Sequence, residues 1–336
     1  MSDKKINLLG YSLESLEAFF NDIGEPKFRA KQLIKWVHQK GILDFSQMTD
    51  FNKILREKLE LIACLRTPMV EKVYKSPEGT IKYLVKLESG SMIEMVRIPE
   101  KKRMTLCISS QAGCALQCTF CATGAQGFET NLTPDEIIGP LLNFEPVIES
   151  AKIMKEQLAY GLSRKRITIS TSGITPQIDK LCNEIDVSLA ISLHAPTNEL
   201  RDEIVPINKK YPISNLINSC NNYLKNYDGK RSITIEYILI DGINDSEELA
   251  RKLAKLLSNI SCKINLIPFN PFEGSNYKRS KTKTIENFKK ILMDKGFITT
   301  LRVTRGDAID GACGQLVGKL NKSIKGKKLI SHKLIS

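Results

Sequence analysis

Three closely spaced cysteines are the residues of this sequence best suited to chemistry. Cys114, Cys118 and Cys121 follow one another at spacings of four and three residues, directly after a β-like run over residues 104–109. Three thiolates at such spacings can hold three irons of a [4Fe–4S] cube, and the iron without a protein ligand stays open to a substrate. The pattern therefore predicts an iron–sulfur cluster with one open position.

A structural zinc ion is the main alternative for these cysteines. Such a site needs a fourth Cys or His nearby, and the next candidates along the chain are Cys182 and His194. A zinc knuckle completed by a distant residue and a chance group of buried thiols both stay open on spacing alone.

The loop around the cysteines resembles the radical S-adenosylmethionine (SAM) enzymes. In that superfamily a Cys-x3-Cys-x2-Cys loop follows the first strand of a β/α domain, and an aromatic usually precedes the third cysteine, as Phe120 does here. The segments 107–114, 121–124 and 127–133 narrow the resemblance to the RlmN family, over nearly the whole chain. That family methylates C2 of adenosine in 23S rRNA and in tRNA. The resemblance implies two cofactors, a [4Fe–4S] cluster on the three cysteines and SAM.

The resemblance also implies a radical route, because adenine C2 is too poor a nucleophile for polar methyl transfer. One SAM methylates Cys313, and a second yields a 5′-deoxyadenosyl radical that takes hydrogen from the new methyl group. The carbon radical adds to C2, and Cys107 resolves the adduct through a disulfide. Glu94 matches the proton acceptor. On residue type alone, the two cysteines could be packed thiols and Glu94 a solvated carboxylate.

Five further residues match the SAM-contacting positions of the family. They are Ser170, the run Ser192, Leu193 and His194, and Asn270, and each closes or follows a predicted strand. Polar groups at strand ends suit the amino acid, ribose and adenine of SAM. Singly, Ser170 could be a turn residue and His194 a hydrogen-bonded core histidine.

From residue 104 onward, predicted strands alternate with helices, which indicates an α/β domain with a parallel sheet. The resemblance makes this domain a partial TIM-like (β/α) barrel of the radical-SAM type, with its chemistry at the carboxyl ends of the strands. The expected strands cover residues 104–109, 166–170, 186–193, 232–240, 263–267 and 298–303.

Residues 11–62 read as helices. Ser12 is the expected N-cap of the first one, and the segment 26–40 predicts a helix with Phe28 and Leu33 on its apolar side. A basic remainder suits contact with a phosphate backbone, and a solvated helix face is the alternative. The basic residues expected away from the apolar side are Lys27, Arg29, Lys31, Lys35 and Lys40.

Residues 69–98 alternate between apolar and polar types with two turn signals, which predicts a small antiparallel meander leading into the cluster strand. We therefore expect four parts in the chain. They are a basic, RNA-contacting helical module over 1–66, the meander over 67–100, the catalytic domain over 101–318 and a basic tail over 319–336.

One segment of the RlmN pattern is missing between Gly139 and Pro140. The family continues from its first helix into a second strand ending in Gly-x-Gly-Glu-Pro, whose Gly and Glu hold the amino group of SAM. Here Gly139 runs directly into what looks like the proline of that motif. A βαβ unit takes about 30 residues or more, and residues 133–165 show helix patterns only. We expect one barrel strand and one SAM contact to be absent.

Composition and charge indicate the class of partner and the compartment that suit this chain. The 336 residues carry 50 Lys and Arg against 37 Asp and Glu, a net charge of +13 that favours a polyanionic partner, although solubility alone could explain it. The first residues lack a signal-peptide pattern, and no run approaches the roughly 18 apolar residues of a membrane span. With clustered cysteines among nine in all, a reducing cytoplasm and no membrane contact are expected.

The expected partners are 23S rRNA, tRNA and an electron-donor protein such as flavodoxin, with the chain itself a monomer. Two alternatives remain. A repurposed or impaired [4Fe–4S] RNA-binding relative would keep the cluster but lose turnover through the missing segment. A C8-methylating resistance relative would share all the cysteines.

Overall fold

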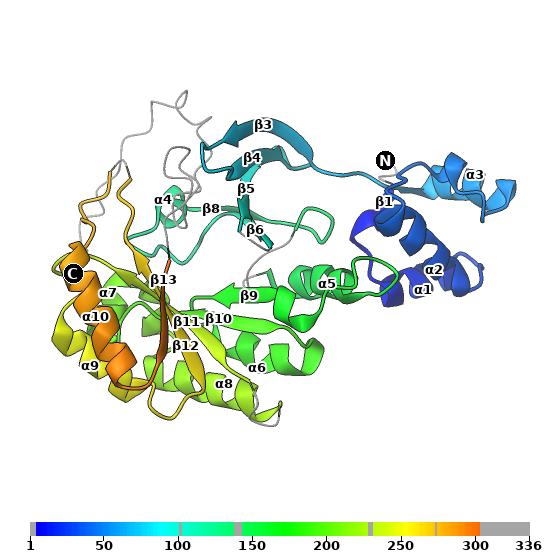
Figure 1. Ribbon diagram of the computed structural model, residues 1–336. Coiled ribbons are helices and arrows are strands. Elements are labelled where there is room, and N and C mark those ends of the chain that lie inside the picture. The colour runs from blue at the N-terminus through cyan, green and yellow to red at the C-terminus, as the bar shows by residue number, and fades with distance from the viewer. Residues whose placement is uncertain (1–4, 101–102, 138–142, 228–230, 273, 303–336) are drawn as a thin grey trace, which may run out of the picture.

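The computed structural model describes residues 5–100, 103–137, 143–227, 231–272 and 274–302. A helical N-terminal module, an antiparallel sheet and an α/β body follow one another along the chain (Figure 1). Cys313, the tail over 319–336 and the junction of Gly139 with Pro140 lie outside the described residues. Within the described ranges, no helix is long and apolar enough to cross a lipid bilayer.

The N-terminal module packs its helices around a core of its own. Ser12 caps the first helix as predicted, because its hydroxyl accepts a hydrogen bond from the Ser15 amide. Phe28 was expected on the apolar side but is 53% exposed, whereas Leu33 is buried. The elements are β1 (Ile6–Asn7), η1 (Leu8–Gly10), α1 (Leu13–Asp22), α2 (Phe28–Ile34), η2 (Lys35–Gln39), η3 (Phe45–Gln47), α3 (Lys53–Ile62) and β2 (Ala63–Cys64).

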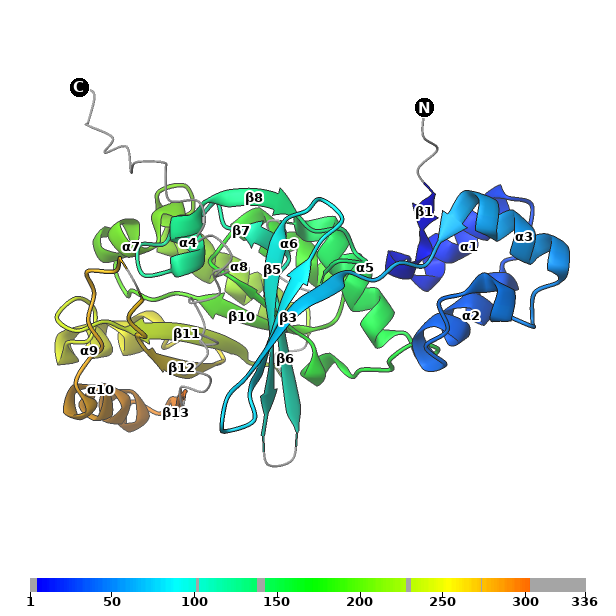
Figure 2. The ribbon, with the colours of Figure 1, turned by 90° about the horizontal axis from the view of Figure 1, so that it is seen from above.

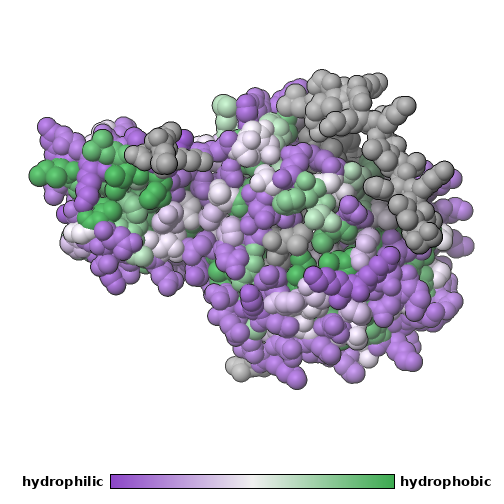
Figure 3. Space-filling view, turned by 180° about the vertical axis from the view of Figure 1, so that it is seen from behind, coloured by the Kyte–Doolittle hydropathy of each residue, from purple (hydrophilic) through white to green (hydrophobic). Residues whose placement is uncertain are grey.

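The surface of this module is mixed. The four lysines of the predicted basic side are exposed, while Arg29 is half-buried. Helix α3 exposes Ile54 (78%) and Leu61 (76%). In the view from behind, apolar residues gather on this module more than on most of the α/β body (Figure 3).

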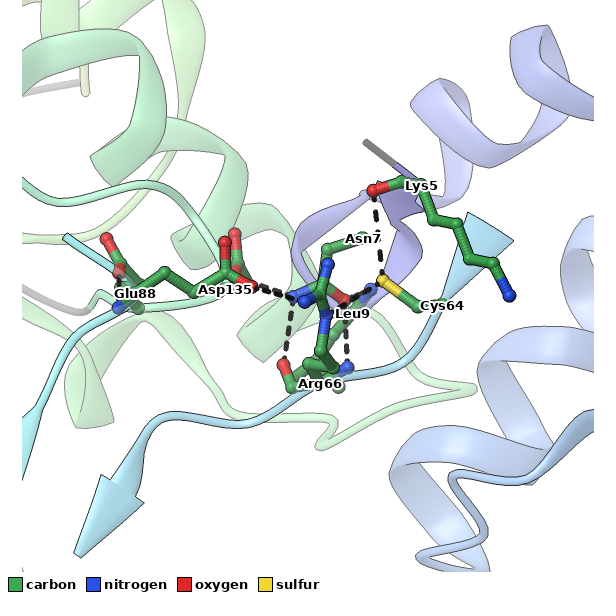
Figure 4. A network of polar contacts seen from close by, with 8 residues as sticks. Lys5, Asn7, Leu9, Cys64, Arg66, Glu88 and Asp135 are labelled. Atoms are coloured by element: carbon green, nitrogen blue, oxygen red, sulfur yellow. Dashed lines mark hydrogen bonds and ion pairs between the residues drawn. The ribbon is translucent and has the colours of Figure 1, made fainter. Parts of the chain in front are cut away.

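Asn7 ties the module to the rest of the chain. Its Nδ2 donates to the Arg66 carbonyl at 2.9 Å and to Asp135 Oδ2 at 2.8 Å, and its Oδ1 accepts from the Arg66 amide at 3.0 Å. Arg66 in turn pairs with Glu88 at 3.2 Å. Figure 4 shows these side chains meeting between the module and the body. Gly10 is required at this contact, because a Cβ there would lie 2.5 Å from the Asp135 amide nitrogen.

The antiparallel sheet has one strand more than predicted. Its order is β3-β4-β5-β6, with β3 (Met69–Lys75), β4 (Ile81–Lys86), β5 (Met92–Pro99) and β6 (Met104–Ile108), and the four strands form one ribbon (Figure 2). The prediction that β6 opens the parallel barrel is wrong. A link as short as that between β5 and β6 allows a hairpin, whereas parallel neighbours need a crossover of a dozen residues or more.

The α/β body contains the five other predicted strands in one parallel sheet. Its order is β13-β12-β11-β10-β9, and every pairing is parallel. The strands are β9 (Thr168–Thr171), β10 (Ser188–Ser192), β11 (Ile233–Leu239), β12 (Cys262–Pro268) and β13 (Ile298–Leu301). The helices are α5 (Phe144–Lys155), α6 (Thr175–Glu184), α7 (Asn198–Ile204), α8 (Ile213–Lys225), α9 (Glu247–Leu256) and α10 (Thr282–Asp294), with the 3-10 turns η5 (Arg164–Arg166) and η6 (Pro206–Lys209).

The two faces of this sheet differ in character. One face is apolar and packs against α6, α8, α9 and α10 in the main core, through residues such as Ile191, Ile235 and Leu266. Side chains of a strand alternate between faces, so the register puts a polar row on the other face, which the antiparallel sheet overlies (Figure 1). That row consists of Ser170, Ser192, Glu236, Asn265 and Thr300.

The parallel sheet has an open edge where the missing strand was expected. Among the described residues, β9 pairs with β10 alone, and the described parts of 133–165 contain helix and turns but no strand. The described strands therefore form an open sheet, and β6, which was expected to be the first barrel strand, does not pair with β9. This arrangement is a parallel α/β body of the expected class in which barrel closure is not seen.

Candidate active site

Two short strands, β7 (Gln111–Gly113) and β8 (Phe128–Asn131), hold the cysteine loop at its base. The Cys114 amide donates to the Gly127 carbonyl at 2.8 Å. Gly113 has φ +71°, and a Cβ there would lie 1.8 Å from that same carbonyl oxygen. Only glycine allows this close approach. The loop ends in the short helix α4 (Ala122–Gln126), which begins directly after Cys121.

The three thiols lie within electrostatic range of one another. Burial, together with the Cys121 and Cys114 thiolates, raises the pKa of Cys118 to about 12. Burial also raises the pKa of Cys114, and the Cys121 thiolate adds to this rise. Thiolates that repel one another are stabilised by a bound cationic centre.

The donor set fits an iron–sulfur cube better than a single ion. A zinc ion needs its sulfur ligands about 2.3 Å from one point, and no three His, Cys, Asp or Glu side chains converge in this way among the residues described. A cube places each thiolate on a different iron. The loop offers three free, half-buried cysteines, the all-thiolate donor set that such a cube takes.

The cysteine loop rests on α7. The Thr119 amide donates to the Ile204 carbonyl at 3.2 Å, and the Thr119 hydroxyl lies 2.9 Å from that of Tyr277. Phe120 is buried in an apolar cluster with Ile204 and Ala195, and Cys118 packs against the same cluster. These contacts set the loop beside the carboxyl end of β10.

His194 forms the neighbouring surface, and its ring lies edge to face with Phe120 at 4.8 Å between centroids. Burial, with a smaller effect of the Arg201 charge, lowers its pKa to about 3. Its Nδ1 accepts a hydrogen bond from the Ile238 amide at 3.1 Å, so the neutral ring carries its proton on Nε2. His194 also has a left-handed backbone, φ +62°, a conformation that costs energy outside glycine and often marks a functional site.

The remaining predicted SAM contacts gather at the same edge of the parallel sheet. Ser170 is the next-to-last residue of β9, and Ser192 ends β10 with buried Leu193 directly after it. Asn270 is half-buried, two residues beyond the end of β12. The structure thus brings all five expected positions to the carboxyl ends of three parallel strands, where ligands bind in α/β sheets.

The antiparallel sheet contributes Glu94 and Cys107 on one face. Glu94 lies opposite Leu84, Lys82 opposite Val96, and Val96 opposite Cys107, so their side chains point the same way. Cys107 was expected on the strand that presents the cluster, but it lies on β6, and β7 carries the loop.

Charged groups of the parallel sheet reach Cys107. Surrounding protein atoms crowd the thiol and raise its pKa by desolvation, Arg302 opposes this rise, and Glu236 adds to it. Both charged residues belong to the parallel sheet region, at β11 and just after β13. Cys107 therefore lies within electrostatic range of Glu236 in the polar row of the parallel sheet.

Sequence reasoning missed three charged residues of this region. Lys82 is buried and pairs with Glu94 at 3.1 Å. Glu236 on β11 accepts a hydrogen bond from the Ser170 hydroxyl at 3.5 Å. Arg201 on α7 is fully buried. The signal for Glu236 was a lone carboxylate inside an apolar strand pattern, whereas Lys82 and Arg201 sat in ordinary polar positions of their elements.

Comparison with known proteins agrees with this geometry. The family model described as "Ribosomal RNA large subunit methyltransferase N-terminal domain" matches residues 6–65. The dual-specificity RNA methyltransferase RlmN of Marinomonas sp. (strain MWYL1) is 50% identical over 360 residues, covering 97% of each chain. The protein of the same name from Pseudomonas entomophila (strain L48) is 50% identical over 350 residues, covering 95% of this chain and 92% of the relative.

A crystal structure of a radical SAM methyltransferase from Sphaerobacter thermophilus superposes with a TM-score of 0.85 at 36% identity, covering 93% of this chain and 99% of that one. With this identity over nearly the full length, and with the cysteine loop at the carboxyl edge of a parallel sheet, the chain belongs to the RlmN family of dual-specificity RNA methyltransferases.

Proposed function

We propose that this protein methylates C2 of adenosine in 23S rRNA, at the peptidyl-transferase centre, and in tRNA, beside the anticodon, with a [4Fe–4S] cluster and SAM. The observation that carries this proposal is the meeting of three features at one sheet edge. The cysteine loop and the His194 surface adjoin through Phe120. Cys107, which shares a face of the antiparallel sheet with Glu94, lies within electrostatic reach of Glu236 on the polar row.

Cys114, Cys118 and Cys121 hold the cluster, which when bound supplies the electron that cleaves SAM. Ser170, Ser192, Leu193, His194 and Asn270 hold SAM at the carboxyl edge of the sheet. Because the ring of His194 is neutral, it offers an N–H donor and adds no charge beside a cationic sulfonium.

Cys313 receives the methyl group and carries it to adenine C2. Cys107 resolves the adduct from its place on β6, on the face that it shares with Glu94. Its raised pKa keeps it protonated at neutral pH until a base removes the proton. Glu94 serves as proton acceptor, and the buried Lys82 ammonium holds its carboxylate in place at 3.1 Å.

The segment missing between Gly139 and Pro140 should lower the rate of methylation. The alignment with the Marinomonas relative spans 360 positions, more than the 336 residues of this chain, so that relative has residues without a counterpart here. We infer that they include the strand between Gly139 and Pro140, and the open edge of β9 supports this. An impaired [4Fe–4S] RNA-binding relative is therefore the second candidate.

We assign RNA binding to the basic surfaces of the protein. The exposed lysines of α2 and of the turn after it suit a phosphate backbone, so we assign the module over residues 1–66 to RNA contact and residues 101–318 to catalysis. A small acidic electron donor such as flavodoxin fits the net charge of +13. We further propose that the chain acts as a cytoplasmic monomer.

The decisive test is incubation of anaerobically reconstituted protein with SAM, a reductant and rRNA or tRNA, followed by mass spectrometry of the nucleosides. The expected product is 2-methyladenosine, absent with Cys118→Ala as matched control. Formation of 8-methyladenosine would replace the proposed regiochemistry. A reconstituted cluster and bound RNA without any methylated nucleoside would favour the second candidate.

A further inference from the structure

Arg201 is a charged side chain that is completely buried, with 0% of its surface exposed. It lies in the middle of α7, and its guanidinium makes four hydrogen bonds. Nε donates to the Leu193 carbonyl at 3.0 Å, and Nη2 donates to the carbonyls of Ser172 at 2.5 Å and Ser192 at 3.4 Å. Nη1 donates to Asn208 Oδ1 at 2.9 Å. The planar fork of arginine is suited to holding several acceptors in fixed directions.

Three of these acceptors lie at the ends of two neighbouring strands. Ser172 follows β9 directly, while Ser192 and Leu193 end and follow β10. One side chain therefore ties together the two strand ends that carry Ser170 and the segment from Ser192 to His194. Gly173 packs close to it, because a Cβ there would lie 3.3 Å from Arg201 Nη2.

The guanidinium group of Arg201 is itself held in place by a neighbouring side chain. Asn208, whose side chain is buried, accepts from Nη1 and donates from its own Nδ2 to Asp202 Oδ1 at 2.6 Å. Asp202 therefore compensates the buried cation through an intervening amide rather than by direct contact. Burial lowers the pKa of Arg201 to about 10, so the side chain stays charged at neutral pH.

The same helix carries the cysteine loop. Ile204, one turn after Arg201, accepts the hydrogen bond from the Thr119 amide at 3.2 Å and packs in the apolar cluster of Phe120. Cys118 packs against that cluster as well, and so does Leu200, the residue before Arg201 in α7. The charge of Arg201 therefore lies within electrostatic range of the Cys118 sulfur. α7 thus joins the surface assigned to SAM and the loop assigned to the cluster.

We propose that Arg201 is a positioning residue that fixes the SAM-binding strand ends relative to the cluster loop and holds a permanent positive charge behind Cys118. This inference rests on the function proposed above. A buried cation next to one cluster ligand stabilises the reduced, more negative cluster, since outer partners of ligands tune a metal centre. Its hydrogen bonds keep Ser192 and His194 at the distance from the loop that SAM must span.

Two substitutions separate these effects. Arg201→Met removes both the charge and the fork, whereas Arg201→Lys keeps the charge but loses the planar set of donors. The matched control is Arg231→Met, because Arg231 pairs with Asp186 at 2.7 Å just before β11 begins, at the opposite end of the parallel sheet. Its loss should lower stability without reaching the site.

The measurements are the SAM dissociation constant of the reconstituted protein, the midpoint potential of its cluster and the thermal midpoint. Arg201→Met should weaken SAM binding about 10- to 100-fold, a loss of the size that removing an outer partner of a metal ligand typically causes in metal affinity or activity, and shift the potential to more negative values. Arg201→Lys should weaken SAM binding but keep the potential near that of the wild type. Arg231→Met should change only the thermal midpoint.

If Arg201→Met fails to fold, Arg201→Lys still tests the positioning role. Unchanged SAM affinity in Arg201→Lys would overturn that role. SAM affinity and potential in Arg201→Met equal to those of Arg231→Met would overturn the inference while leaving the proposed function intact. A wild-type chain that takes up no cluster would overturn the proposed function and this inference with it.

Discussion

The Nζ atom of Lys82 lies 3.1 Å from Glu94 Oε1, and only 2% of either side chain is exposed. The pair sits on neighbouring strands of the antiparallel sheet, two residues out of direct register. The Lys82 ammonium also lies 5.2 Å from the centre of the Tyr74 ring. A buried ion pair that includes the assigned proton acceptor links the stability of this sheet to its chemistry.

Breaking this pair from one side should be more harmful than removing it whole. Lys82→Met leaves the Glu94 carboxylate buried without its cation, a change that typically costs about 3–5 kcal/mol. The double variant Lys82→Met with Glu94→Gln should recover part of that loss. Denaturant unfolding of Lys82→Met, Glu94→Gln and the double variant gives the coupling energy, and strictly additive losses would mean that the pair does not act as a unit.

Each of Cys114, Cys118 and Cys121 should be required for the cluster. A cube left with two thiolates is poorly held, so each change to Ala should abolish the brown colour and the roughly four irons per chain expected after anaerobic reconstitution. Cys182→Ala is the matched control, since that half-exposed thiol lies outside the loop. Tight uptake of one zinc and no iron by the wild type would contradict the radical chemistry.

Substitution of the two cysteines assigned to the reaction, Cys313 and Cys107, should block methyl transfer at different steps. Cys313→Ala should remove all methyl transfer and leave the cluster intact, because no methyl carrier forms. Cys107→Ala should trap protein on RNA, because the adduct forms but is not resolved. Denaturing gels with labelled RNA distinguish the two, and a Cys107→Ala protein that turns over without any crosslink would remove Cys107 from its assigned role.

His194 should make the fold sensitive to acid. Its folded pKa of about 3 lies below the ordinary value of 6.5, so the unfolded chain binds the proton more readily between these values. The contribution of neutral His194 to the free energy of unfolding is therefore complete above pH 6.5. It falls by up to about 1.4 kcal/mol per pH unit as the pH drops toward 3. His38, with a pKa near 4, acts in the same direction. Unfolding of His194→Gln from pH 7 to 4 should therefore show a smaller slope than the wild type, and equal slopes would contradict a buried neutral ring.

Restoring the missing segment should raise activity. A family segment inserted between Gly139 and Pro140 would give β9 a partner on its open edge and return the contact to the amino group of SAM, about 1.5–3 kcal/mol of binding. We expect tighter SAM binding and faster methylation, because misplacement of about 1 Å can lower a rate ~100-fold. A linker of equal length rich in Gly and Ser is the control. Full family-level activity without the insertion would show that another residue holds SAM.

Local patterns in the sequence were enough to predict much of this protein. The cysteine spacing indicated the cluster loop, the period-two segments indicated β3, β4 and β5, and the alternation of elements indicated the five parallel strands. The N-cap at Ser12 was predicted from residue type as well. These features depend on neighbours along the chain, so they can be read from the chain alone.

Only the tertiary structure decided what meets across the chain. The position of β6 depended on which strand it pairs with, and Cys107 moved with it from the cluster strand to the face it shares with Glu94. The burial of Lys82 and Arg201 could not be read from sequence, because charged residues are usually exposed and only the packed fold provides their partners. Strand pairing and compensation of buried charge join residues far apart in sequence, and so they are fixed by packing rather than by local pattern.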